Sequence, residues 1–324
     1  MLAHVLPILI VLGLWWASTG LILYLDSREK RTFGLSMLAA TALAALALKG
    51  IATAATITTS ASAYAGFACG LALWGWQLLA FYTGFLAGPR RTVCEPASSM
   101  FARFWQGAGA SLYHEAAVAA GAAVVATLTV GQPNRVALWT YLVLWGMHES
   151  AKLNLFFGVP NLGAEMLPPH LAYLTSYMRR RAMSLFFPAS VSVATAVTAL
   201  LHQYTSRTAA TPFEVASGAM LTALMALAIL EHWFLVAPID ASALWRAFVR
   251  KPKNQLVASA VRPELPGLCP NAEPDGVVEN RDHVRGSPVK AGSLHGNSRP
   301  PVRIIVGGLD TRSEPGLAVE ERTP

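Results

Sequence analysis

The stretch Trp145–Asn161, WGMHESAKLNLFFGVPN, decides the fold class, because it ends a long apolar run and yet carries charge. Its polar side chains are His148, Glu149, Lys152 and Asn154. Hydrocarbon accepts such groups only where they face protein, a cofactor or water. On a helix, Lys152 follows His148 by four residues and Glu149 by three, so the three side chains share or border one face. The simpler alternative is that Lys152 and Asn154 reach the membrane interface while Glu149 only pairs with Lys152.

The composition is that of an integral membrane protein. Of the 324 residues, 54% are hydrophobic and 13% are charged, whereas about 25% of the residues in an ordinary soluble domain are charged. The formal net charge is +7. Because the basic residues lie in short clusters between apolar segments, they indicate orientation in a membrane and argue against a nucleic-acid partner.

Seven apolar segments come near the length of about twenty residues that a bilayer core requires. They predict an all-α protein with about seven transmembrane helices, at residues 6–25, 33–53, 63–87, 109–130, 136–157, 185–201 and 215–237. Two amphipathic segments, residues 92–108 and 162–183, are expected to lie on the membrane surface. In the first of them, Arg103 is expected on the side that faces water.

Orientation follows from the basic residues of the loops. One set of alternate loops carries Arg28, Lys30, Arg31, Arg90, Arg91, Arg103, Arg179, Arg180, Arg181, Arg246, Arg250, Lys251 and Lys253. The other set carries only Arg135, Arg207 and Lys49. The positive-inside rule therefore predicts that the N-terminus is outside and the C-terminus is in the cytoplasm.

The composition changes after Asn254 to Pro, Gly, Arg, Glu and Ser with few aromatic residues. A segment of this kind buries too little apolar surface to fold alone. We therefore expect a transmembrane domain in residues 1–254 and a disordered cytoplasmic tail in residues 255–324.

Four of the predicted helices place polar side chains at similar depths in the cytoplasmic half of the membrane, counting ~1.5 Å of rise per residue. These candidate site residues are Gln77, His114, Glu115, His148, Glu149, Lys152, Asn154, Glu231 and His232. Each is costly in hydrocarbon unless it faces the interior of the protein. We expect them to line a polar pocket that binds a ligand.

Three roles are compatible with these residues. The first is a hydrogen-bonded seam that fixes helix register. The second is contact with a tetrapyrrole, whose central metal accepts an axial histidine, beside tryptophan side chains that pack on the ring. The third is a non-haem metal site with three histidine ligands and three carboxylates, namely His114, His148 and His232 with Glu115, Glu149 and Glu231. Neighbouring residues on a helix point about 100° apart, so an adjacent His-Glu pair seldom supplies two ligands.

The motifs of soluble enzymes are absent from the sequence. It has no glycine-rich phosphate loop, nucleophile elbow, His-Glu-x-x-His motif or cysteine cluster, which argues against ATP-driven catalysis. A transporter would be favoured by two similar halves with broken helices, and residues 1–130 do not resemble residues 131–250.

Four motifs occur in the order in which they are found in one known family. They are GFLAGPRR at residues 84–91, SAKLNLFFGVPN at 150–161, LPPHLAYLTSY at 167–177 and LEHWFL at 230–235. Over about residues 1–253 the chain resembles the photosynthetic complex assembly proteins PuhE of purple phototrophic bacteria. It departs from them in the third helix, where Trp-His-Glu is frequent and this chain has Trp76-Gln77-Leu78, and in its long tail.

The resemblance implies a multi-pass protein of the inner membrane, in the photosynthetic intracytoplasmic membrane. It implies a role in assembling the reaction centre and its core antenna, through the handling or regulation of bacteriochlorophyll supply. The implied partners are the lipid bilayer and either subunits of these complexes or enzymes of pigment biosynthesis. No catalytic residues come with the resemblance, so an enzymatic activity stays open. The alternatives are a membrane metalloenzyme acting on a tetrapyrrole or a related hydrophobic substrate and, third, a transporter of pigment precursors.

Overall fold

The computed structural model describes residues 2–97, 99–207, 210–239, 241–245 and 248. The expected tail, residues 255–324, lies outside the described residues. The described part contains seven α-helices and no named strand, which confirms the all-α prediction. The helices are α1 (Leu2–Asp26), α2 (Phe33–Ala55), α3 (Ser60–Tyr82), α4 (Met100–Thr129), α5 (Val136–Phe157), α6 (Phe186–Thr205) and α7 (Pro212–Phe234).

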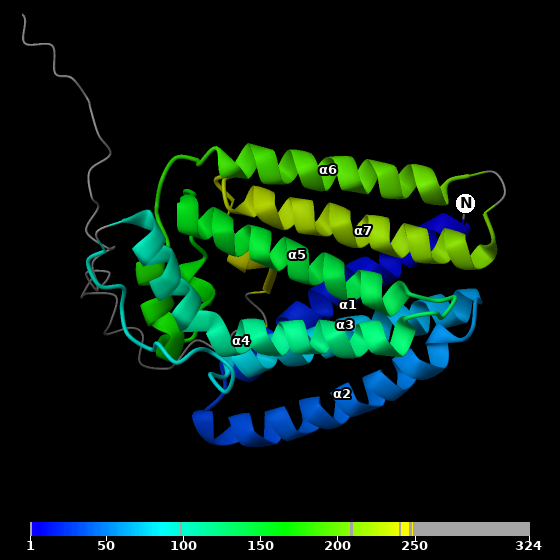
Figure 1. The fold of residues 1–324 in the computed structure, drawn as a ribbon, viewed down its shortest axis with the longest axis horizontal. Helices are drawn as coiled ribbons and strands as arrows, with labels where there is room; N and C mark the ends of the chain where they lie inside the picture. The colour runs from blue at the N-terminus through cyan, green and yellow to red at the C-terminus, as the bar shows by residue number, and fades with distance from the viewer. Residues whose placement is uncertain (1, 98, 208–209, 240, 246–247, 249–324) are drawn as a thin grey trace, which may run out of the picture. The chain divides into compact units, whose positions relative to one another are not determined.

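Successive helices run in opposite directions, with α2 and α6 at opposite sides of the group (Figure 1). Helix α3 lies in the middle and packs against α2, α5 and α7, while α1 and α6 pack on α7. Two apolar cores meet at α3. Trp74 belongs to the core formed with α2, α4 and α5, and Phe67, two turns earlier, belongs to the core formed with α1 and α7.

Six of the described helices are long and apolar enough to cross a membrane. Helix α5 is not among them, because the second half of this 22-residue helix contains the polar stretch quoted above. It is instead surrounded by α3, α4, α6 and α7. The outer side of α2 exposes Leu35, Leu38, Leu43 and Leu46, as a surface facing lipid does. The number of spans that cross the bilayer and their orientation stay predictions.

The connections α1–α2, α3–α4 and α5–α6 meet at one end of the helices. We call this the basic end, because it contains Arg28, Lys30, Arg31, Arg90, Arg91, Arg179, Arg180 and Arg181. Side-chain contacts join the connections: the His170 and Phe33 rings lie 5.9 Å apart, and Arg90 Nε donates to the Tyr177 hydroxyl at 2.9 Å. The basic residues of these three connections, which the sequence assigns to one side of the membrane, therefore lie at the same end of the helices.

Two helix boundaries differ by five residues or more from the sequence-based expectation, and both lie near the basic end. Helix α3 ends at Tyr82 rather than residue 87, because the chain turns at Gly84, whose φ is 81°. The expected surface helix at residues 92–108 is wrong in extent, since its second half forms the start of α4 after the N-cap Ser99. Helix α4 bends after this first part (Figure 1). At the bend the α3–α4 connection supplies a bond partner, the Ala87 carbonyl, which accepts from the His114 amide at 3.1 Å.

The second expected surface segment contains two short 3₁₀ helices, η2 (Ala164–Met166) and η3 (Pro169–Tyr177). Segment η3 packs on α4 and covers Arg103. The expectation that Arg103 faces water is therefore wrong, because its side chain is 7% exposed. The guanidinium donates to the carbonyls of Phe156 and Tyr177 and lies 4.2 Å from the Phe156 ring centroid, contacts that replace its hydration.

Helices α3 and α5 approach closely because Gly66 and Gly70 face α5. A Cβ atom on Gly70 would lie 2.9 Å from the Ala137 carbonyl oxygen, whereas a Cβ atom on Gly75 of the same helix would meet nothing within 4 Å. We expect Gly70→Ala to destabilise the protein by about 1–3 kcal/mol through overpacking. Gly75→Ala should be neutral or stabilising, because alanine favours helix.

Thermal unfolding of both variants in the same detergent tests this packing. Equal midpoints for Gly70→Ala and Gly75→Ala would contradict the described contact between α3 and α5.

Candidate functional site

Helices α4 and α5 bring His114 and His148 together in the interior. The ring centroids are 5.6 Å apart, with an angle of 71° between the ring planes. His114 belongs to the buried side of α4, where buried residues recur at every third or fourth position, as do Ser111 and Val118 on either side of it. The ring centroid of Trp74 on α3 lies 5.5 Å from the ring centroid of His148, so three helices meet at the histidine pair.

The imidazole of His114 is fully buried, and neither ring nitrogen has a hydrogen-bond partner among the described residues. Buried polar atoms are almost always paired, so this exception needs an explanation. His148 is half-buried and makes no hydrogen bond to a described residue. Its ring nitrogens are therefore available to a ligand, with His114 directly behind it.

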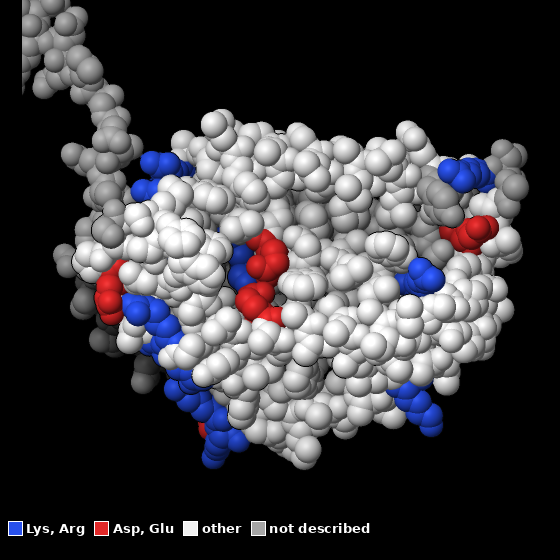
Figure 2. Space-filling view, in the orientation of Figure 1, with Lys and Arg blue, Asp and Glu red and all other residues white. Residues whose placement is uncertain are grey.

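An ion cluster lies beside the histidines. Lys152 Nζ donates to a carboxylate oxygen of Glu115 on α4 and, at 3.1 Å, to Glu149 one turn earlier on α5. The three side chains are 28–36% exposed. Figure 2 shows acidic and basic atoms together in the otherwise uncharged middle of this face, between α4 and α5. The cluster thus opens sideways, at a level where apolar side chains surround it.

The cluster is not neutral by side-chain count, because one ammonium group faces two carboxylates. It carries either an excess negative charge or a shared proton. Both states are costly in contact with hydrocarbon, and a polar or charged group laid over the opening would lower that cost.

Gln77 of α3 is a further polar residue of this region. Its Nε2 donates at 3.0 Å to the Ala117 carbonyl, one turn after His114, while its buried Oε1 has no partner among the described residues. Tyr141 donates at 3.0 Å to the next carbonyl, that of Val118. The unpaired acceptor of Gln77, which reaches α4 from α3, therefore lies beside the same stretch of α4 that carries the unpaired nitrogens of His114.

The remaining predicted site residues connect helices elsewhere. Asn154 is buried and donates to Ser190 Oγ of α6 at 3.1 Å. His232 is also buried, and its Nδ1 lies 2.8 Å from the Ala228 carbonyl. Since a carbonyl can only accept, Nδ1 carries the proton, and Nε2 accepts from the hydroxyl of Ser150 on α5 at 2.9 Å.

The expected set of metal ligands is divided among three places. His114 and His148 are together, with Glu115 and Glu149 next to them in sequence; His232 is bonded to Ser150; and Glu231 is exposed and accepts from Trp15 Nε1 at 2.7 Å. Among the described residues, no group of three or more His, Cys, Asp or Glu side chains is arranged to hold a metal ion. The residues that are brought together are Gln77, His114, Glu115, His148, Glu149 and Lys152.

Sequence reasoning expected tryptophan side chains such as Trp74 near these histidines but missed Phe81 of α3. Trp74 contacts His148, and Phe81 lies 4.8 Å from the His114 ring. The two aromatic residues are seven apart, so they share one side of α3 after two turns. This spacing could have predicted that both aromatic side chains lie near the histidines, if it had been known that α3 packs against α4 and α5.

Replacing Lys152 tests the role of the ion cluster. Lys152→Met leaves two carboxylates side by side, so it should destabilise the protein by up to the ~3–5 kcal/mol that breaking a fully buried pair costs. The triple variant Lys152→Met, Glu115→Gln, Glu149→Gln should recover most of this loss, because it removes the charges together.

Thermal unfolding in detergent measures both effects, with Arg31→Met as the matched control, since the Arg31–Glu29 pair is exposed at the helix ends. A triple variant no more stable than Lys152→Met would show that charge balance is not what holds α4 and α5 together.

The comparisons with known proteins cover nearly all of this helical region. A family model described as "Protein of unknown function (DUF3623)" matches residues 1–256. The chain is 34% identical over 263 residues to a Rhodobacter capsulatus protein described as "Uncharacterized 30.4 kDa protein in puhA 5'region", and the match covers 80% of this chain and 95% of that protein. No solved structure matches the chain. The chain that carries this histidine pair and ion cluster therefore belongs to the DUF3623 family.

Proposed function

We propose that this protein is an assembly factor of the PuhE type for the photosynthetic reaction centre and its core antenna, and that it handles bacteriochlorophyll or regulates its supply. The description of the relative places it in the 5' region of puhA, which points to a photosynthesis gene region. The apolar helices suit a bilayer, and the proposed location is the inner membrane with its photosynthetic extensions.

The observation that carries the pigment part of the proposal is the histidine pair. A bacteriochlorophyll is a flat macrocycle whose central magnesium accepts one axial nitrogen ligand. His148 offers an imidazole without a hydrogen-bond partner among the described residues, beside the Trp74 ring. Because His148 is only half-buried, the macrocycle would approach from the lipid side between α4 and α5 and would not enter the helix interior.

The ion cluster would orient the macrocycle as it approaches His148. His148 and Lys152 are one turn apart on α5, so the charged cluster lies next to the proposed ligand nitrogen. Polar groups at the edge of a tetrapyrrole can pair with Lys152 or with a protonated carboxyl. A pigment held there would also cover the sideways opening of the cluster, which lowers the cost of charge facing lipid.

Pigment binding can be tested on protein purified in mild detergent from phototrophically grown cells. We expect an absorbance band of a bound bacteriochlorin, and we expect His148→Ala to lower the pigment-to-protein ratio about tenfold, the effect of losing one strong ligand interaction. His202→Ala is the matched control, because His202 is exposed in the last turn of α6, at the end of the helix opposite to the basic end.

Wild-type protein without pigment, or a His148→Ala variant that retains it, would remove His148 from this role. A pigment ratio that falls equally in His202→Ala would mean that the loss reflects general instability.

The cellular role needs a separate measurement. Deleting the gene in the host bacterium should lower the amount of reaction centre and core antenna relative to total membrane protein, while their transcripts stay unchanged. Complementation with the wild-type gene should restore both, and complementation with the His148→Ala gene should restore them only in part. Normal complexes in the deletion strain would contradict an assembly role, whatever the pigment experiment shows.

A further inference from the structure

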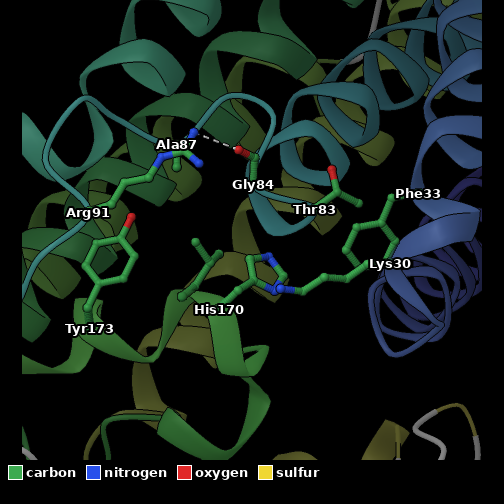
Figure 3. A pocket seen from close by; sticks show the side chains of 9 residues that line it. Lys30, Phe33, Thr83, Gly84, Ala87, Arg91, His170 and Tyr173 are labelled. Atoms are coloured by element: carbon green, nitrogen blue, oxygen red, sulfur yellow. Dashed lines mark hydrogen bonds between the residues drawn. The ribbon is translucent and has the colours of Figure 1, made fainter.

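A second site lies at the basic end and is formed by other side chains than the histidine pair. A partly open cavity of about 200 Å³ is lined by the α1–α2 connection, the start of α2, the α3–α4 connection and η3 (Figure 3). The chain can close around it because Gly84, with φ 81°, passes next to His170, where a Cβ atom would lie 3.2 Å from the imidazole Cδ2. Ligand pockets for drug-sized molecules measure about 300–1,000 Å³. This cavity therefore suits a small group and not a macrocycle.

The cavity wall is positively charged. Lys30 and Arg91 line it, and no Asp or Glu does. Neither cation forms an ion pair with a described carboxylate, since the nearby Glu29 pairs with Arg31. Figure 3 shows Arg91 on one side of His170 and Lys30 on the other. The Arg91 guanidinium donates from Nη2 to the Gly84 carbonyl at 3.1 Å and from Nε to the Gly88 carbonyl at 3.4 Å, which fixes it at the wall and leaves the Nη1 N–H groups unused.

Two further side chains complete the lining. The hydroxyl of Tyr173 is buried and has no hydrogen-bond partner among the described residues. Burial raises the pKa of Tyr173, so the hydroxyl keeps its proton and can donate. His170 Nε2 donates to the Tyr82 carbonyl at 2.8 Å. Burial lowers the pKa of His170, and Lys30 and Arg91 act in the same direction, so the positive charge of the cavity at neutral pH lies on those two residues.

We propose that this cavity binds a phosphate group, held between Lys30 and Arg91 with Tyr173 donating from the wall. Two cations without carboxylate partners, an unpaired hydroxyl and the lack of acidic lining residues all match an oxyanion. The cavity lies where helix α2 begins and helix α3 ends, the level at which we expect lipid headgroups. Basic pockets between transmembrane helices commonly hold anionic headgroups. The phosphate can come from an anionic lipid or from free phosphate in solution.

The test uses the full chain, purified in detergent and stripped of lipid. Phosphatidylglycerol, phosphatidylcholine and inorganic phosphate are added separately, and binding is followed by native mass spectrometry and by the shift of the unfolding temperature. The main variant is Lys30→Gln, because Lys30 makes no described hydrogen bond or ion pair and its loss should leave the fold intact. Tyr173→Phe removes the unpaired hydroxyl alone, and Arg31→Gln is the control, one residue from Lys30 but outside the cavity.

We expect phosphatidylglycerol to bind and stabilise the protein, with phosphatidylcholine weaker. Lys30→Gln should weaken this binding about tenfold, which is the loss expected for one charge-assisted hydrogen bond. Tyr173→Phe should weaken the binding less, and Arg31→Gln should leave it unchanged. Stabilisation by inorganic phosphate with the same variant pattern would assign the cavity to free phosphate. The proposal would be overturned if the protein bound neither phosphatidylglycerol nor inorganic phosphate. It would also be overturned if Arg31→Gln and Lys30→Gln weakened binding equally, because that result would indicate only general attraction to basic residues.

Discussion

Charged and polar side chains on a helix that packs among apolar helices need partners on those neighbours, and this constraint organises the protein around α5. Four of the five polar residues in the second half of α5 each contact a different neighbouring helix, and the fifth, Glu149, pairs with Lys152 on α5 itself. The pairs are His148 with Trp74 of α3, Lys152 with Glu115 of α4, Asn154 with Ser190 of α6, and Ser150 with His232 of α7. The four helices around α5 are therefore joined to it by specific contacts in addition to apolar packing.

Most of the fold could be predicted from the sequence, because apolar runs of bilayer length identify helices without tertiary information. The boundaries near the basic end could not. The end of α3 depends on the turn at Gly84, and the unbroken start of α4 depends on bonds that the α3–α4 connection makes at the bend. The burial of Arg103 was also hidden, because its acceptors are backbone carbonyls of α5 and η3, distant in sequence.

The candidate site was predictable in part for the same reason. Helical periodicity separates His114 from Glu115 by about 100°, and the structure indeed buries the first and turns the second toward the open side between α4 and α5. Periodicity cannot say which helices become neighbours, so it grouped His232 and Glu231 with the others. Their partners, Ser150 and Trp15, belong to helices that only tertiary packing brings next to α7.

The ion cluster also constrains how the chain is made. Helix α5 is not apolar enough by its own composition to count as a membrane-crossing helix, whereas α4, synthesised just before it, is. Only residues 130–135 separate the two helices. On the predicted topology, the contact between Lys152 of α5 and Glu115 of α4 favours entry of the two helices into the bilayer as one hairpin, because the charges of both helices are then paired with each other as well as within α5. The order of synthesis thereby becomes part of the folding route.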